Sequence, residues 1–177
     1  DNDGFWGTED DYGFGPYPTN VQGLVVEAVQ AADPYVDFST FAVGGTVEGL
    51  FVVHSGRGAE TDPFRTDWIW SHQWYLEQYA VTVDGVRVDS YSMEPEYTYS
   101  PGDATVGVYC HEYGHLLGLW DLYDIDYTSA GLGEWSLMAA GCWNGPDYDG
   151  SCPTHFDAYS RIQLGWVSPQ VVLGTVT

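Results

Sequence analysis

The sequence contains no lysine, and only four arginines stand against 26 aspartates and glutamates. The formal net charge at pH 7 is −22. A nucleic-acid backbone and an anionic membrane surface both require a basic protein face, so this composition argues against either as a partner. Such a charge keeps a chain soluble but strains its compact state by repulsion, which salt or bound divalent cations relieve.

Long apolar runs are also missing. No stretch reaches the roughly 18 consecutive apolar residues that a membrane-spanning helix needs. The chain opens with Asp1-Asn2-Asp3-Gly4, without a basic segment or an apolar leader. We therefore expect a mature or trimmed domain whose secretion signal and pro-segment lie outside this sequence, and an extracellular location.

Cysteine is scarce, with three residues. Cys142 and Cys152 bracket a loop rich in Gly, Pro, Asp and Asn, a spacing that favours a small disulfide ring and an oxidising compartment. Cys110 would then remain unpaired. We expect Cys110 to be a small buried apolar residue and not a reactive thiol or a metal ligand.

The chain is long enough for one domain with a sizeable core, because it has 177 residues of which 44% are hydrophobic. We predict a single domain over residues 1–177, with an irregular arm over residues 1–18. The pattern is α+β. Helices are expected over a segment capped by Thr19 or Asn20 and ended by Pro34, over Ala104–Leu117 and over Thr154–Leu164. Strands are expected over Val47–His54 and in a hairpin, Tyr79–Val83 with Val86–Tyr91, around Asp84-Gly85.

The segment from Cys110 to Asp124 reads C-H-E-Y-G-H-L-L-G-L-W-D-L-Y-D. On a helix, residues four apart lie on one face, so His111 and His115 can bind one Zn²⁺ together. Glu112 follows the first ligand and can reach a water on that metal. Two imidazoles and an adjacent carboxylate base form the arrangement of a zinc peptidase.

A catalytic zinc also needs a third protein ligand. Gly118 falls where the helix must end, and a glycine in the left-handed conformation would turn the chain there. That turn would bring Asp121 back towards the metal. Glu134 is the alternative third ligand, at a spacing closer to that of thermolysin-like enzymes.

Taken together, the motifs resemble the immune inhibitor A (M6) family of secreted metalloproteases, within the metzincins. The matching segments are V-D-F-S, F-V-V-H-S-G-R-G-A-E, W-I-W-S-H-Q-W, the histidine motif, W-S-L-M-A-A-G-C-W and R-I-Q-L-G-W, in that order. The resemblance implies a metzincin-like catalytic domain with a twisted, mostly parallel sheet, an active-site helix and a C-terminal helix. It implies zinc on His111, His115 and Asp121, Glu112 as general base, Met138 in a turn beneath the metal, and a protein or peptide substrate.

The sequence departs from the family pattern at two places. Relatives often carry an acidic, glycine-rich loop after V-D-F-S, whereas the segment from Phe41 to Gly49 has Glu48 as its only acid. Several metzincins place a tyrosine two residues after the turn methionine, and this chain has Ala140. A structural Ca²⁺ could instead bind the loop of Asn144, Asp147 and Asp149, for which a solvated turn is the alternative.

Other functions stay open at this stage. A non-catalytic module could keep the fold and the metal, although such a relative could lose Glu112 at no structural cost. A zinc hydrolase for glycosylated proteins could use the aromatic stretch Trp68 to Tyr75, which core packing explains as well. His72 within that stretch is the lone histidine best placed for the cleft. We expect a monomer.

Overall fold

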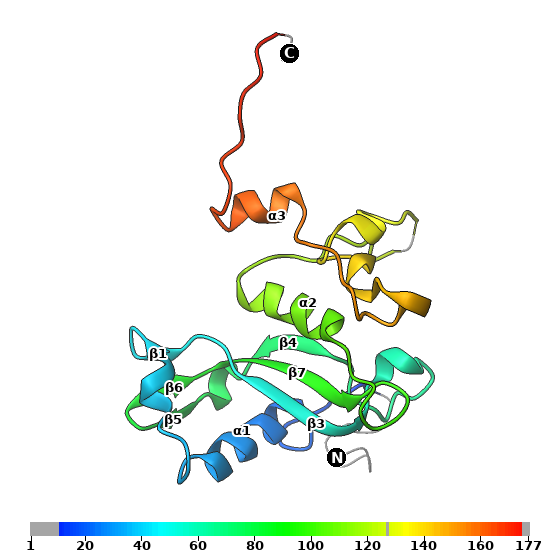
Figure 1. The fold of residues 1–177 in the computed structure, drawn as a ribbon. Helices are drawn as coiled ribbons and strands as arrows, with labels where there is room; N and C mark the ends of the chain where they lie inside the picture. The colour runs from blue at the N-terminus through cyan, green and yellow to red at the C-terminus, as the bar shows by residue number, and fades with distance from the viewer. Residues whose placement is uncertain (1–10, 127, 175–177) are drawn as a thin grey trace.

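The computed structural model describes residues 11–126 and 128–174, and Figure 1 shows its fold. Its three α-helices are α1 (Val21–Ala32), α2 (Val106–Leu116) and α3 (Ala158–Gln163). Its strands are β1 (Ala42–Val43), β2 (Thr46–Val47), β3 (Phe51–Arg57), β4 (His72–Tyr75), β5 (Val81–Val83), β6 (Val86–Val88) and β7 (Ser90–Tyr97). Short 3-10 turns fill most of the connections. The architecture is α+β, as predicted.

Helix α1 begins where the sequence predicts. The side chain of Asn20 accepts a hydrogen bond from the backbone N–H of Gly23 and so caps the helix, a contact that contributes about 1 kcal/mol. The buried face of α1 consists of valines, among them Val21, Val25 and Val29. A helix with this apolar stripe must pack on another layer.

The strands form two mixed sheets, in the orders β1-β2-β6-β5 and β3-β7-β4. The prediction of a mostly parallel sheet is therefore wrong: of the five strand pairs, β2–β6 and β3–β7 are parallel and the other three are antiparallel. Two-residue turns account for two of the three antiparallel pairs. Asp84 and Gly85 both have positive φ, as the predicted two-residue hairpin requires, and they join β5 to β6 antiparallel. Gly44 and Gly45 do the same between β1 and β2.

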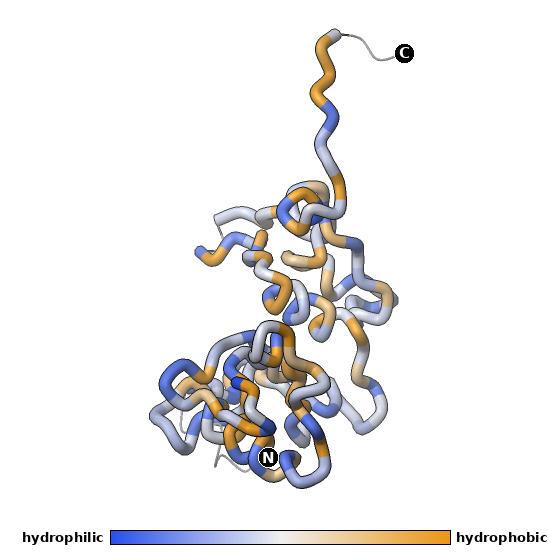
Figure 2. The backbone as a smooth tube through the Cα atoms, turned by 90° about the vertical axis from the view of Figure 1, so that its left-hand side faces the viewer, coloured by the Kyte–Doolittle hydropathy of each residue, from blue (hydrophilic) through white to orange (hydrophobic). Residues whose placement is uncertain are grey.

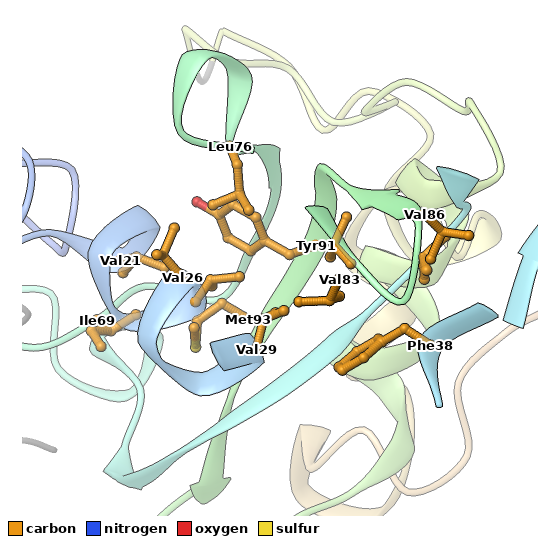
Figure 3. Packing of buried hydrophobic residues seen from close by; sticks show 13 residues of the cluster. Val21, Val26, Val29, Phe38, Ile69, Leu76, Val83, Val86, Tyr91 and Met93 are labelled. Atoms are coloured by element: carbon orange, nitrogen blue, oxygen red, sulfur yellow. The ribbon is translucent and has the colours of Figure 1, made fainter. Parts of the chain in front are cut away.

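The hydrophobic core lies between α1 and the sheets. Valines of α1 pack with Ile69, Leu76 and the inward faces of β5, β6 and β7 (Figure 3). Tyr91 and Met93 of β7 are fully buried there. Helix α2 lies across the other side of the β3-β7-β4 sheet, so this sheet separates the core from the functional layer (Figure 1).

Several predicted elements have different bounds. The second hairpin strand, predicted over Val86–Tyr91, ends at Val88, and β7 begins at Ser90. The strand expected over Val47–His54 begins at Phe51 instead, because Val47 pairs with β6 in the other sheet. The helix expected from Thr154 begins at Ala158, since the backbones of Thr154 and His155 bond to Gly141 and Leu137 in place of a helical turn. The irregular character predicted for residues 1–18 holds for residues 11–18, while residues 1–10 lie outside the described residues.

After α3 the chain leaves the body as an extended segment, and Figure 2 shows an apolar stretch within it. Val171 and Leu173 are exposed there. None of the helices in the described parts of the chain is long and apolar enough to cross a membrane.

Candidate metal centre

Helix α2 presents His111 and His115 on one face, one turn apart, with their rings nearly perpendicular. Asp121 approaches both. Its Oδ1 lies 3.0 Å from Nε2 of His111 and 3.2 Å from Nε2 of His115. Among the described residues, this is the only group of three or more His, Cys, Asp or Glu side chains whose ligand atoms converge, all within 4.8 Å of one another.

The turn at Gly118 creates this convergence. Gly118 has φ +90°, the left-handed conformation predicted for it, and its N–H donates to the carbonyl of His115. The N–H of Leu119 then donates to the carbonyl of Gly114, which closes the end of α2. The reversal carries Asp121 back alongside the helix, as the motif spacing predicts.

Backbone contacts orient both imidazoles. Nδ1 of His111 lies 2.8 Å from the carbonyl oxygen of Leu137, and Nδ1 of His115 lies 2.9 Å from that of Leu119. Because a carbonyl oxygen only accepts, each Nδ1 carries a proton, and Nε2 of each neutral ring is left to bind a metal. Fixing the distal nitrogen in this way is how proteins hold histidine ligands in position.

The charges of the three groups are strongly linked. Burial lowers the pKa of His111, but hydrogen bonds to Asp121 and Cys142 outweigh it and raise this pKa to about 10. Burial by itself would raise the pKa of Asp121. Its hydrogen bonds to the two histidines outweigh burial and hold this pKa well below the ordinary value. A site that concentrates positive charge around one carboxylate can exchange its protons for a dication.

The residues therefore fit Zn²⁺. Two imidazole nitrogens and one carboxylate oxygen are the ligand types of a catalytic zinc site, and the three-ligand set leaves a position open for water. The alternative ligand Glu134 lies elsewhere: it is exposed on a 3-10 turn and is not part of the converging group. Asp124 accepts hydrogen bonds from Thr128 and Ser129 and so orders its own loop.

Glu112 is buried beside the histidines and lines the same cavity. Burial raises the pKa of its carboxyl group, while the two histidines and a hydrogen bond from the backbone N–H of Gln73 oppose the shift. Gln73 belongs to β4, the edge strand of its sheet. The edge strand thus holds the carboxylate in place next to the candidate metal ligands.

Met138 is fully buried beneath α2. Its N–H donates to the hydroxyl of Ser136, and its carbonyl accepts from the N–H of Leu122 next to Asp121. Ser136 in turn donates to Asp157, the N-cap of α3. This chain of contacts ties the methionine turn to both the third candidate ligand and the C-terminal helix.

The structure does not contain the predicted disulfide between Cys142 and Cys152, and all three cysteines are free thiols. Cys142 is buried and bonds to His111, so its side chain is turned towards the metal site, while Cys152 is exposed. Cys110 is partly buried on α2, as expected. The calcium site predicted at Asn144, Asp147 and Asp149 also finds no support. The amide of Asn144 is bound to the carbonyl of Glu134, and Asp149 accepts from Ser151.

A cavity of about 620 Å³ opens over the three candidate ligands. Strand β4 and the residues just before it form one wall, and the segment after Met138 forms another. Lining residues that matter below are Glu60, Val108, Glu112, Asp124, Cys142 and Trp143. One wall of the cavity is therefore the edge of a sheet.

Residues 18–167 match the family model described as the immune inhibitor A peptidase M6, catalytic domain. The chain belongs to this family. Over 169 residues, this M6 chain is 32% identical to immune inhibitor A of Bacillus thuringiensis subsp. alesti, covering 81% of this chain and 24% of that protein. It is also 32% identical to the pre-pro-metalloprotease PrtV of Vibrio cholerae serotype O1, covering 80% of this chain and 18% of the relative.

The M6 chain thus spans about a quarter or less of the length of these relatives. The family that the motifs predicted is confirmed.

Sequence reasoning missed several residues around the site. Tyr123 lies nearly parallel to the ring of His111, with ring centroids 6.3 Å apart. Glu60 reaches the cavity from the turn after β3, and its place in the F-V-V-H-S-G-R-G-A-E segment was the available signal. His72 does line the cavity, but it is buried and both ring nitrogens have partners, the carbonyl of Trp70 and the hydroxyl of Tyr91.

Proposed function

We propose that this chain is a single, metzincin-like catalytic domain over residues 1–177, and that it acts as a zinc-dependent endopeptidase in the extracellular space. The observation that carries the proposal is the convergence of His111, His115 and Asp121 in a cavity that also contains Glu112. Membership of the M6 family supports the same activity. The strongly acidic composition favours a protein or peptide substrate over nucleic acid.

His111, His115 and Asp121 would hold the metal. When bound, Zn²⁺ supplies Lewis-acid polarisation of a carbonyl group and lowers the pKa of a bound water towards ~7. The imidazoles are held by backbone carbonyls, so the ligand geometry exists before the metal enters. Met138 is fully buried, and its sulfur lies against Gly114 of α2.

Glu112 is the candidate base. Its carboxyl group accepts a proton from the attacking water and later delivers it to the departing amine. Burial raises its pKa above the ordinary value, which moves the group towards the range where it can both accept and release a proton. The hydrogen bond from Gln73 keeps the carboxylate oriented during both transfers.

The edge strand β4 offers a place for the substrate backbone. It pairs only with β7 within its sheet, and its residues form one wall of the cavity. An extended peptide that adds to such an edge gains main-chain hydrogen bonds and exposes one peptide bond to the metal site.

A peptide mixture, incubated with the zinc-loaded protein and sequenced afterwards, tests the proposal. We expect cleavage that stops when zinc is chelated and returns when zinc is restored. The matched variant Glu112→Ala should keep its zinc and fold while turnover falls at least ~100-fold, because the base is lost and the ligands remain. Cleavage that resists chelation, or undiminished turnover by Glu112→Ala, would exclude this mechanism.

A further inference from the structure

Four carboxylates line the cavity, and no lysine or arginine does. The arginines of the chain are engaged elsewhere with acidic side chains or backbone carbonyls: Arg57, Arg65, Arg87 and Arg161. Within the described part of the chain, the histidines are therefore the only cationic groups at the cavity, and a further positive charge there would come from a metal or a ligand.

Three of the four carboxylates already have a role or a full set of partners. Asp121 lies against both histidines, and Glu112 is held by Gln73 beside them. Asp124 accepts hydrogen bonds from its own loop, including three from Thr128 and Ser129. The fourth carboxylate, Glu60, has one partner among the described residues, Ser71, whose hydroxyl lies 2.5 Å from Oε1.

Glu60 is poorly solvated for an acid. Burial raises the pKa of its carboxyl group, and the bonds from Ser71 only partly offset the effect. The fully buried Glu94 lies in the same surroundings: its Oε2 has no hydrogen-bond partner, and burial, together with the charges of Glu112 and Glu60, raises its pKa to about 8, so the group is mostly neutral at pH 7. The charged form of a partly buried acid such as Glu60 is stabilised by an opposite charge brought next to it.

The surroundings of Glu60 suit a long side chain. Glu60, Val108 and Trp143 line both the main cavity and a smaller one next to it, so they form the partition between the two. Val108 stands four residues before Glu112 on α2, about 6 Å along the axis. Val108 and the ring of Trp143 can contact the aliphatic part of an arginine or lysine side chain. The carboxylate of Glu60 can then pair with its positively charged end.

We infer that Glu60, with Val108 and Trp143, forms a subsite that selects a cationic side chain, arginine or lysine, close to the scissile bond. The inference rests on the proposed function and adds a substrate class to it. In this arrangement the substrate backbone lies along β4. The cationic side chain points towards the carboxylate of Glu60, between Val108 and Trp143. The net charge of −22 also attracts basic peptides to the protein, which favours the same cationic substrates.

The test has two steps. Products from a random peptide mixture first show which position near the cleaved bond is selective. Matched peptides with arginine or uncharged norleucine at that position are then compared by kcat/KM. The wild type should prefer arginine at least ~10-fold, and Glu60→Gln should lose about 10- to 100-fold on the arginine peptide while changing less than about twofold on the norleucine peptide.

Glu27→Gln is the matched control, since it removes the same charge from an exposed site on α1, behind the sheet. It should leave both peptides unaffected, which separates the subsite from long-range attraction. Equal losses on both peptides in Glu60→Gln would mean that Glu60 only supports the fold through Ser71, and would overturn the subsite. So would a wild type without preference for the cationic peptide, a result that needs no variant.

A calorimetric measurement keeps the subsite separate from turnover. In the Glu112→Ala background, the arginine peptide should bind at least ~10-fold more tightly than the norleucine peptide, and Glu60→Gln should remove the difference. If cleavage fails but this binding difference is found, the proposed activity falls and the subsite stands. If cleavage is found without the binding difference, the subsite alone falls.

Discussion

Gly114 lies directly against the side chain of Met138: a Cβ atom on this glycine would be 2.3 Å from the methionine sulfur. The same atom would be 3.0 Å from the ring of Phe156. The glycine within H-E-Y-G-H is thus required by the methionine turn beneath the helix, and the two halves of the site are matched in shape.

We predict that Gly114→Ala destabilises the protein by about 1–3 kcal/mol, because the added methyl group overpacks a fully buried position. In an uncrowded helix the same substitution would stabilise by about 1 kcal/mol. Urea unfolding of the metal-free protein measures the change. In a Met138→Ala background the penalty should shrink, and an unchanged penalty there would contradict the proposed contact.

The third metal ligand can be separated from its alternative by paired variants. Asp121→Ala should lower zinc affinity by more than ~100-fold, since loss of a group that merely holds a ligand in place already costs about 10- to 100-fold. Glu134→Ala should have no effect, because Glu134 is exposed and outside the converging group. Competition with a chelator gives both affinities, and the reverse pattern would indicate a thermolysin-like ligand set.

Asp157 should make the free energy of unfolding depend on pH in the acidic range. Burial would raise the pKa of its carboxyl group, but hydrogen bonds from Ser160 and Ser136 outweigh burial and hold the pKa below its ordinary value. A depressed pKa stabilises the fold above the unfolded-state value, near 4. This contribution is lost as the pH falls through that value towards the folded-state pKa.

We expect Asp157→Ala to cost about 0.5–2 kcal/mol at pH 7, the usual loss for an N-cap, and progressively less as the pH is lowered to ~3. Asp157→Asn is the control, because it keeps an acceptor for the cap but has no charge to titrate. Unfolding curves from pH 3 to 7 measure all three proteins. A constant difference between wild type and Asp157→Asn over this range would refute the electrostatic contribution.

The thiols give a direct check on the missing disulfide. Intact-mass analysis after alkylation of the denatured, unreduced protein should show three modified cysteines. In the folded protein Cys152 should react first, because it is exposed while Cys142 is buried against His111. One modified cysteine would instead show that Cys142 turns away from His111 to pair with Cys152.

Charge repulsion predicts a salt-dependent melting temperature. With a net charge of −22 and no lysine, the melting temperature should rise with NaCl, since the screening length falls from ~30 Å at 0.01 M to ~3 Å at 1 M. Calcium at constant ionic strength should add nothing, because Asn144 and Asp149 are bound to Glu134 and Ser151 and, among the described residues, no acidic group of three converges in this loop. A further rise with calcium would reveal a specific site, and indifference to both salts would show that the acidity does not strain the fold.

Much of the site could be predicted because it is local in sequence. His111, Glu112 and His115 lie within two turns of one helix, and Gly118 reverses the chain in the next few residues, so helical period and glycine chemistry are sufficient. The Asn20 cap and the Asp84-Gly85 hairpin are local in the same sense. These elements formed where the sequence placed them.

What the sequence alone determined about this protein is the set of short-range relations: the spacing of the candidate ligands His111, His115 and Asp121, the position of the candidate base Glu112 beside them, and the acidic charge. Only the tertiary structure decided which distant segments meet. It set the strand pairing as mixed within each sheet, and it placed β2 and β3 in different sheets. It turned Cys142 towards His111 rather than Cys152, and it brought Glu60 into the cavity. The physical reason is that such contacts depend on how layers pack, and no repeat or spacing along the chain records the distance between residues that far apart.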